Sequence, residues 1–140
     1  MYDINNFKLL DDFNIYGQGW GLTNDGQSLI LSDGSEKIYY LNPKNFQIEK
    51  TISVSVNGNK LIYINELEFI RGEIWANIWK SNDIITVNPL SGIVTSIFDI
   101  SKISEQTEIE DVANGIAWDK VNDKIFITGK NWNFIYLLDI

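Results

Sequence analysis

Three stretches of sequence decide the fold: Trp20-Gly21-Leu22-Thr23, Asn65-Glu66-Leu67-Glu68-Phe69 and Asn114-Gly115-Ile116-Ala117-Trp118. Each has an aliphatic residue two positions after its first residue, and each is followed by a turn and a second β-rich run. Those second runs end at Ser32-Asp33, Ile78-Trp79 and Gly129-Lys130. The three starts lie 45 and 49 residues apart. A repeat of roughly 40–50 residues is typical of a four-stranded blade of a β-propeller.

The sequence around these starts consists of short strand-like runs. They cover residues 28–31, 37–41, 49–54, 66–69, 74–79, 84–87, 94–98, 115–118, 124–128 and 134–138. Dipeptides that close hairpins lie between them, namely Asp25-Gly26, Asp33-Gly34, Asn57-Gly58, Arg71-Gly72 and Ser91-Gly92. The best helix candidate, 102–112, lacks a broad apolar stripe, so we interpret it as a loop with one turn at most.

We therefore predict an all-β fold, a β-propeller represented here by about three blades of antiparallel four-stranded sheets. The expected units are 1–18 (partial), 19–63, 64–112 and 113–140 (partial). A two-sheet sandwich is the alternative, although it would not need this long repeat. Closed propellers have four to eight blades. We therefore expect either the C-terminal part of a longer protein, or copies of the chain that pair to complete a ring.

Composition and charge exclude several classes of function and partner. The 140 residues are 44% hydrophobic and 21% charged, as in a globular protein, and carry a net charge of -8. This acidity argues against nucleic acid or an anionic membrane as a partner. The chain has no Cys and no His, so zinc hydrolysis and Ser-His-Asp catalysis are excluded. It shows no apolar run of membrane-spanning length and no leader after Met1, so we expect a cytosolic chain or a leader outside it.

Several strings, in this order, resemble the plant and bacterial type of glutaminyl-peptide cyclotransferase. They are Gly19-Trp20-Gly21-Leu22-Thr23, Ser32-Asp33-Gly34-Ser35, Ile64-Asn65-Glu66-Leu67-Glu68, Trp75-Ala76-Asn77-Ile78-Trp79, Asn114-Gly115-Ile116-Ala117 and Thr128-Gly129-Lys130-Asn131-Trp132. The resemblance implies a five-bladed propeller, of which this chain matches the last three blades. It also implies conversion of N-terminal glutamine in a peptide or protein to pyroglutamate with release of ammonia, without metal or cofactor. Relatives are commonly secreted or periplasmic.

The resemblance also suggests which residues act. It assigns Asn65 and Lys130 to catalysis and Trp20 and Trp79 to substrate binding. Asn114 matches a family pattern, but we assign it no chemical role. The family's acid/base glutamate belongs to an earlier inner-strand motif that has no counterpart here. The resemblance therefore implies that the isolated chain is inactive.

Simpler interpretations remain open for each of these residues. Tryptophans in an all-β protein commonly pack between blades, Asn65 could serve strand-end hydrogen bonding, and Lys130 could be a solvated turn residue. We interpret Trp75, Trp118 and Trp132 as core residues. A non-catalytic propeller that binds a peptide or protein is the alternative function. Open blade edges would also favour self-association.

Overall fold

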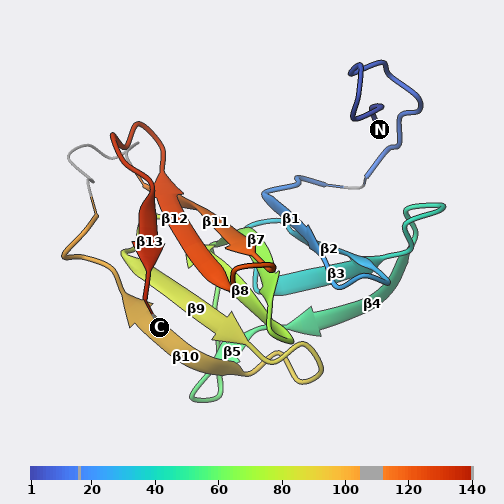
Figure 1. Cartoon of the computed structure of the whole chain (residues 1–140). Helices are drawn as coiled ribbons and strands as arrows, with labels where there is room; N and C mark the ends of the chain where they lie inside the picture. The colour runs from blue at the N-terminus through green and yellow to red at the C-terminus, as the bar shows by residue number, and fades with distance from the viewer. Residues whose placement is uncertain (16, 105–111, 140) are drawn as a thin grey trace.

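The computed structural model describes residues 1–15, 17–104 and 112–139, and its regular secondary structure within these ranges is β-strand (Figure 1). The strands are β1 (Gly21–Asn24), β2 (Leu29–Ser32), β3 (Lys37–Leu41), β4 (Ile48–Ser53), β5 (Ser55–Val56), β6 (Asn59–Lys60), β7 (Ile64–Ile70), β8 (Glu73–Ile78), β9 (Asp83–Val87), β10 (Val94–Asp99), β11 (Ala113–Asp119), β12 (Lys124–Gly129) and β13 (Tyr136–Leu138). In the described part of the chain, no helix is long and apolar enough to cross a membrane.

The larger sheets are antiparallel meanders that follow one another along the chain. β1 to β4 form the first sheet, β7 to β10 the second, and β11 to β13 a third of three strands. In the sequence, the short hairpin of β5 and β6 lies between the first sheet and the second. Strands β1, β7 and β11 lie at the centre of the assembly, whereas β4 and β10 lie on its outside (Figure 1). The all-β architecture of successive propeller-type sheets, predicted from the repeat, is confirmed.

Local turn chemistry explains where several strands end. Asn57 and Gly58 both have positive φ, 51° and 80°, as do Arg71 and Gly72, with 50° and 89°. Positive φ at both central residues is the signature of the type I′ turn, whose twist matches that of a hairpin. The Arg71-Gly72 turn joins β7 to β8, and Asn57-Gly58 closes the β5–β6 hairpin. Most of the proposed loop at 102–112 lies outside the described residues.

Apolar side chains fill the space between successive sheets. One cluster joins the first sheet to the second and includes Ile30, Ile38, Ile64, Leu67 and Ile85. A second joins the second sheet to the third and includes Ile70, Trp75, Ile84, Ile116 and Ile125. Strands of the middle sheet contribute to both clusters, because alternate side chains along a strand point to opposite faces. Strands β7, β8 and β9 of the middle sheet are therefore largely buried on both faces.

Side chains link the central strands, since these belong to different sheets. The Ser32 hydroxyl accepts a hydrogen bond from Gly21 N at 2.9 Å and donates one to the Asn65 carbonyl oxygen at 2.5 Å. Thr23 Oγ1 donates to Glu68 Oε2 at 3.0 Å. These bonds fasten the first sheet to the second along their inner edges.

Two carboxyl groups of β7 make the equivalent link to the third sheet. Glu66 Oε2 accepts from Ile116 N at 3.0 Å, and Glu68 Oε1 accepts from Trp118 N at 3.1 Å. Burial, together with the neighbouring Glu68 carboxylate, raises the pKa of Glu66 to about 7. Because desolvation and like charge both oppose ionisation, this side chain is protonated across much of the acidic range.

The close approach of β1 and β7 predicts that Gly21 tolerates no side chain. A Cβ at this position would lie 2.2 Å from the Asn65 carbonyl oxygen and 2.8 Å from Glu66 Cα, and neither backbone atom can move without its strand. We expect Gly21→Ala to lower the free energy of unfolding by about 1–3 kcal/mol, measured by urea denaturation. Gly19→Ala is the control, since its nearest neighbour is the flexible tip of Ile15 at 3.1 Å. Equal losses in the two variants would contradict the prediction.

The raised pKa of Glu66 predicts a pH-dependent stability. Glutamate has an ordinary pKa of 4.5, against about 7 for Glu66 in the fold. Between these values the folded chain binds more protons than the unfolded chain, so stability falls as pH rises through this window. Above about pH 7 the loss is complete. Glu66→Gln removes this contribution, and its urea midpoint should exceed that of the wild type by more at pH 8 than at pH 5.

A matched control for this pH series is Glu49→Gln on the outer strand β4, where the side chain is exposed. Its urea midpoint should follow the wild-type curve across the same pH range. If Glu66→Gln also followed that curve, burial of a titrating carboxyl between β7 and β11 would be refuted.

Candidate active site

The candidate site residues gather in one pocket at the starts of the central strands. This pocket has a volume of about 310 Å³ and is lined by Trp20, Asn65, Trp79, Asn114 and Lys130. Thus the structure brings together all four residues singled out from the sequence, and it adds Asn114. The pocket spans the three sheets. Trp20 directly precedes β1, whereas Asn65 and Asn114 are the second residues of β7 and β11. Trp79 and Lys130 directly follow β8 and β12.

Equivalent backbone hydrogen bonds set the positions of Trp79 and Lys130. Trp79 N donates to the Tyr63 carbonyl oxygen, and Lys130 N donates to the Val112 carbonyl oxygen, each at 2.9 Å. In both cases the residue after the second strand is tied to the residue before the first. Repetition of this bond in successive sheets places Trp79 and Lys130 at the same level of the structure.

The Asp33-Gly34 turn supports Trp20. Gly34 has a φ of 84°, and a Cβ on it would lie 2.6 Å from the Trp20 ring, so only glycine fits beneath the indole. The indole nitrogen donates to Gln18 Oε1 at 3.0 Å. The Trp20 ring then meets Trp79 edge to face, with centroids 5.5 Å apart. This aromatic pair forms one wall of the pocket.

Tyr63 and Lys80 extend the aromatic wall, and sequence reasoning missed both. The Tyr63 ring contacts Trp79 at a centroid distance of 5.7 Å, and Lys80 Nζ lies 4.2 Å from the centroid of the Trp79 ring. Both residues adopt positive φ, 68° and 62°. Such values are uncommon for residues with side chains. No sequence pattern predicts these positive φ values, because they arise where β7 and β8 join their loops.

Three polar side chains of the pocket make no hydrogen bond to any residue that the structure describes. Asn65 is only 6% exposed, yet within the described residues its carboxamide makes no hydrogen bond. The same holds, across those residues, for the half-buried Asn114 carboxamide and for the exposed Lys130 ammonium. Two carboxamides and one cation therefore converge on a cavity walled by two indoles. Such a set can bind a carbonyl oxygen and stabilise negative charge that develops on it.

The remaining tryptophans lie outside this pocket, as expected. Trp75 is buried and stacks on Phe98 with ring centroids 5.1 Å apart. Trp118 and Trp132 are half-buried and pack against the core between the second and third sheets. The interpretation as a core residue is confirmed for Trp75, whereas Trp118 and Trp132 lie at the margin of that core.

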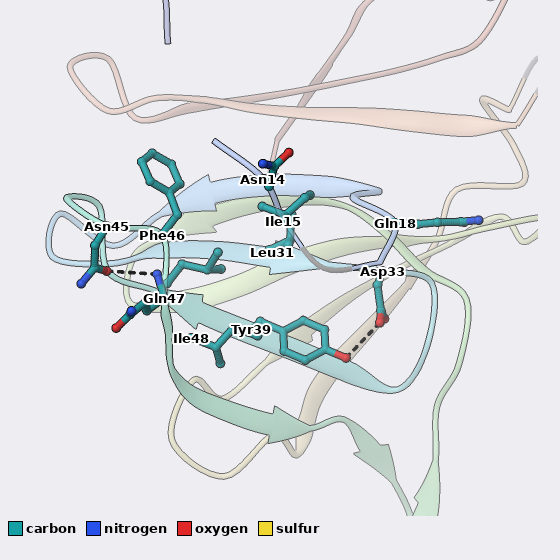
Figure 2. A pocket seen from close by; sticks show the side chains of 11 residues that line it. Asn14, Ile15, Gln18, Leu31, Asp33, Tyr39, Asn45, Phe46, Gln47 and Ile48 are labelled. Atoms are coloured by element: carbon teal, nitrogen blue, oxygen red, sulfur yellow. Dashed lines mark hydrogen bonds between the residues drawn. The ribbon is translucent and has the colours of Figure 1, made fainter. Parts of the chain in front are cut away.

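Asp33 belongs to a different cavity, of about 430 Å³, on the outer side of the first sheet (Figure 2). Its carboxylate accepts hydrogen bonds from Ser35 N at 3.0 Å, Ser35 Oγ at 2.5 Å and Tyr39 Oη at 2.9 Å. Burial opposes ionisation of this carboxyl, but the bonds from Ser35 and Tyr39 outweigh it and lower the pKa of Asp33. The Asp33 carboxylate thus stabilises the turn by these hydrogen bonds. The described residues contain no cluster of metal-ligating side chains.

Comparison with known proteins gives a consistent result over the whole chain. The family model for glutamine cyclotransferase matches residues 1–140. The chain is 35% identical over 145 residues to a glutaminyl-peptide cyclotransferase of Arabidopsis thaliana, covering 99% of this chain and 45% of that protein. The crystal structure of glutaminyl cyclase from Myxococcus xanthus superposes with a TM-score of 0.80 at 33% identity, covering 89% of this chain and 58% of that one.

A streptogramin B lyase structure shares the fold alone, with a TM-score of 0.54 and 19% identity over 87% of this chain and 40% of the lyase. The chain thus spans about half the length of the two cyclases that it matches. Because the family model covers every residue and the cyclase structure superposes on 89% of the chain, the chain belongs to the glutamine cyclotransferase family.

Proposed function

We propose that this chain supplies part of the active site of a glutaminyl-peptide cyclotransferase. In this reaction the α-amine nitrogen of an N-terminal glutamine attacks its own γ-carboxamide carbon. A five-membered lactam forms, and the carboxamide nitrogen leaves as ammonia after gaining a proton. The observation that carries the proposal is the convergence of Trp20, Asn65, Trp79 and Lys130 on one pocket in a member of the cyclase family.

The chemistry of the pocket suits the demands of this reaction. Nucleophile and electrophile belong to the same residue, so much of the catalytic task is to hold the folded-back conformer. Trp20 and Trp79 enclose the glutamine side chain and exclude water. The Asn65 carboxamide and the Lys130 ammonium stabilise the oxyanion of the tetrahedral intermediate. Neither donor makes a hydrogen bond to a described residue, which leaves both available to substrate.

Proton transfer is the requirement that the pocket does not meet by itself. Among the described residues that line it, none carries a carboxylate. Glu66 and Glu68 are close in sequence to Asn65, but both carboxyl groups bond β11 outside the pocket. We therefore propose that the acid/base group comes from polypeptide beyond these residues, and that the chain alone does not turn over.

This proposal predicts that activity appears on complementation only. Ammonia release from a Gln-initiated dipeptide should be at background with the 140-residue chain alone, and should rise when a polypeptide supplying two upstream blades of the family is added. The physical reason is that proton transfer needs a carboxylate within hydrogen-bond reach of the amine and the leaving nitrogen. Activity of the isolated chain that Glu66→Gln or Glu68→Gln abolished would assign the acid to β7 instead.

The oxyanion roles predict large losses in the complemented enzyme. Lys130→Met and Asn65→Ala should each lower kcat by about 10²–10³-fold, because removal of one oxyanion donor costs about 2.7–4 kcal/mol. Trp118→Phe is the control, since Trp118 packs on the core away from the pocket and should keep turnover near the wild-type value. Unchanged kcat in the Lys130 and Asn65 variants would remove both residues from the mechanism. If complementation gave no ammonia at all, the non-catalytic binding module would be favoured.

A further inference from the structure

Asn114 lines the pocket, but neither the proposed mechanism nor the sequence analysis gives it a role. It is the counterpart of Asn65, since both begin the inner-strand motif of their repeat. Its half-buried carboxamide makes no hydrogen bond within the residues that the structure describes. Asn114 is thus the second carboxamide that is unbonded within the described structure, in a pocket for which we propose an amide substrate.

The backbone around Asn114 is held from several directions. The β11–β12 ladder is irregular here, and its register shifts between Ala113 and Ile116. The second sheet supplies two side-chain acceptors to the backbone of this strand start. Asn77 Oδ1 accepts from Gly115 N at 3.1 Å, and Glu66 Oε2 accepts from Ile116 N at 3.0 Å. Gly115, inside the irregular stretch, and Ile116, where the register resumes opposite Ile127, are thus both tied to the neighbouring sheet.

These acceptors occupy an unusual environment. Asn77 is 1% exposed, and its Nδ2 is a buried donor without a partner in the described structure. A buried donor without a partner lowers the stability of the fold, so a residue of this kind is retained only where it serves another purpose. Thr128 closes the remaining side, since a Cβ on Gly115 would lie 2.7 Å from Thr128 Cγ2. The strand start therefore has little room to move, because Asn77 and Glu66 of the second sheet and Thr128 of its own hairpin confine the residues that follow Asn114.

We propose that Asn114 is a substrate-binding residue of this pocket and that Glu66 and Asn77 are positioning residues that hold it in place. The inference rests on the proposed cyclase function. A peptide with N-terminal glutamine presents two carbonyl groups, the γ-carboxamide and the carbonyl of its first peptide bond. With Asn65 and Lys130 assigned to the first, Asn114 is the polar residue left in the pocket to bind the second.

The assignment has a kinetic consequence that separates Asn114 from Asn65. The first peptide bond is unchanged during the reaction, so a hydrogen bond to it is equally strong in the ground state and the transition state. Removing such uniform binding raises KM and leaves kcat unchanged. We expect Asn114→Ala to raise KM for a Gln-initiated dipeptide amide by about two- to tenfold, the effect of one neutral hydrogen bond. Asn65→Ala, in contrast, should act on kcat.

The positioning role is tested in the complemented enzyme by a double-mutant cycle. Glu66→Ala should raise KM as Asn114→Ala does, and the double variant should be no worse than either single one, because Glu66 acts through Asn114. Glu66→Gln should restore KM, since its amide oxygen still accepts from Ile116 N. Glu68→Gln is the matched control, because Glu68 bonds Trp118 N further along β11. Independent, multiplicative effects, or a fall in kcat with Glu66→Gln, would overturn the positioning role.

A second measurement on the 140-residue chain does not depend on turnover. The side-chain amide signals of Asn114 in a ¹⁵N–¹H spectrum should move in Glu66→Ala, stay in place in Glu66→Gln, and shift on addition of the dipeptide amide. The binding role would be overturned if the Asn114 signals did not shift on addition of the dipeptide amide and Asn114→Ala left KM unchanged. If the complemented wild type released no ammonia while these signals still responded to Glu66→Ala and the dipeptide, the cyclase function would fail and the assignment of Asn114 would stand.

Discussion

The hydroxyl of Ser32, bonded to Gly21 N and to the Asn65 carbonyl oxygen, joins two sheets that share no strand. The contact is possible because Gly21 carries no Cβ, which would otherwise overlap the backbone of β7. The bond also fixes the backbone of Asn65, whose carboxamide enters the pocket. The packing of the central strands and the geometry of the candidate site therefore rest on the same few atoms.

The link between the second and third sheets uses different chemistry for the same purpose. Glu66 and Glu68 accept hydrogen bonds from β11, where a strand at the centre of the assembly has no ladder partner on that side. An apolar residue would pack there, but it would leave two buried N–H groups unsatisfied. The cost is a carboxyl whose ionisation is opposed by burial and by its neighbour. Polar residues in the motif of β7 thus connect sheets, while Asn65 beside them faces the cavity.

Repetition explains how one fold builds a site from distant parts of the chain. Trp20, Asn65 and Asn114 start equivalent strands, and they meet because each sheet presents its inner strand to the same central region (Figure 1). This arrangement lets aromatic walls and polar groups be distributed among sheets, and it makes a site in this family dependent on several of them.

Much of this organisation could be predicted from residues close together in sequence. The spacing of Trp20, Asn65 and Asn114 predicted the repeat, Asn57-Gly58 and Arg71-Gly72 predicted tight turns, and the family strings singled out residues that share a pocket. These features depend on strand alternation and turn conformation, which operate over a few residues. The irregular start of β11, the positive φ of Tyr63 and the bonds from Glu66 and Asn77 were decided by tertiary structure. Each depends on how closely two sheets approach, and that distance is set by side-chain packing across the whole assembly rather than by any local sequence pattern.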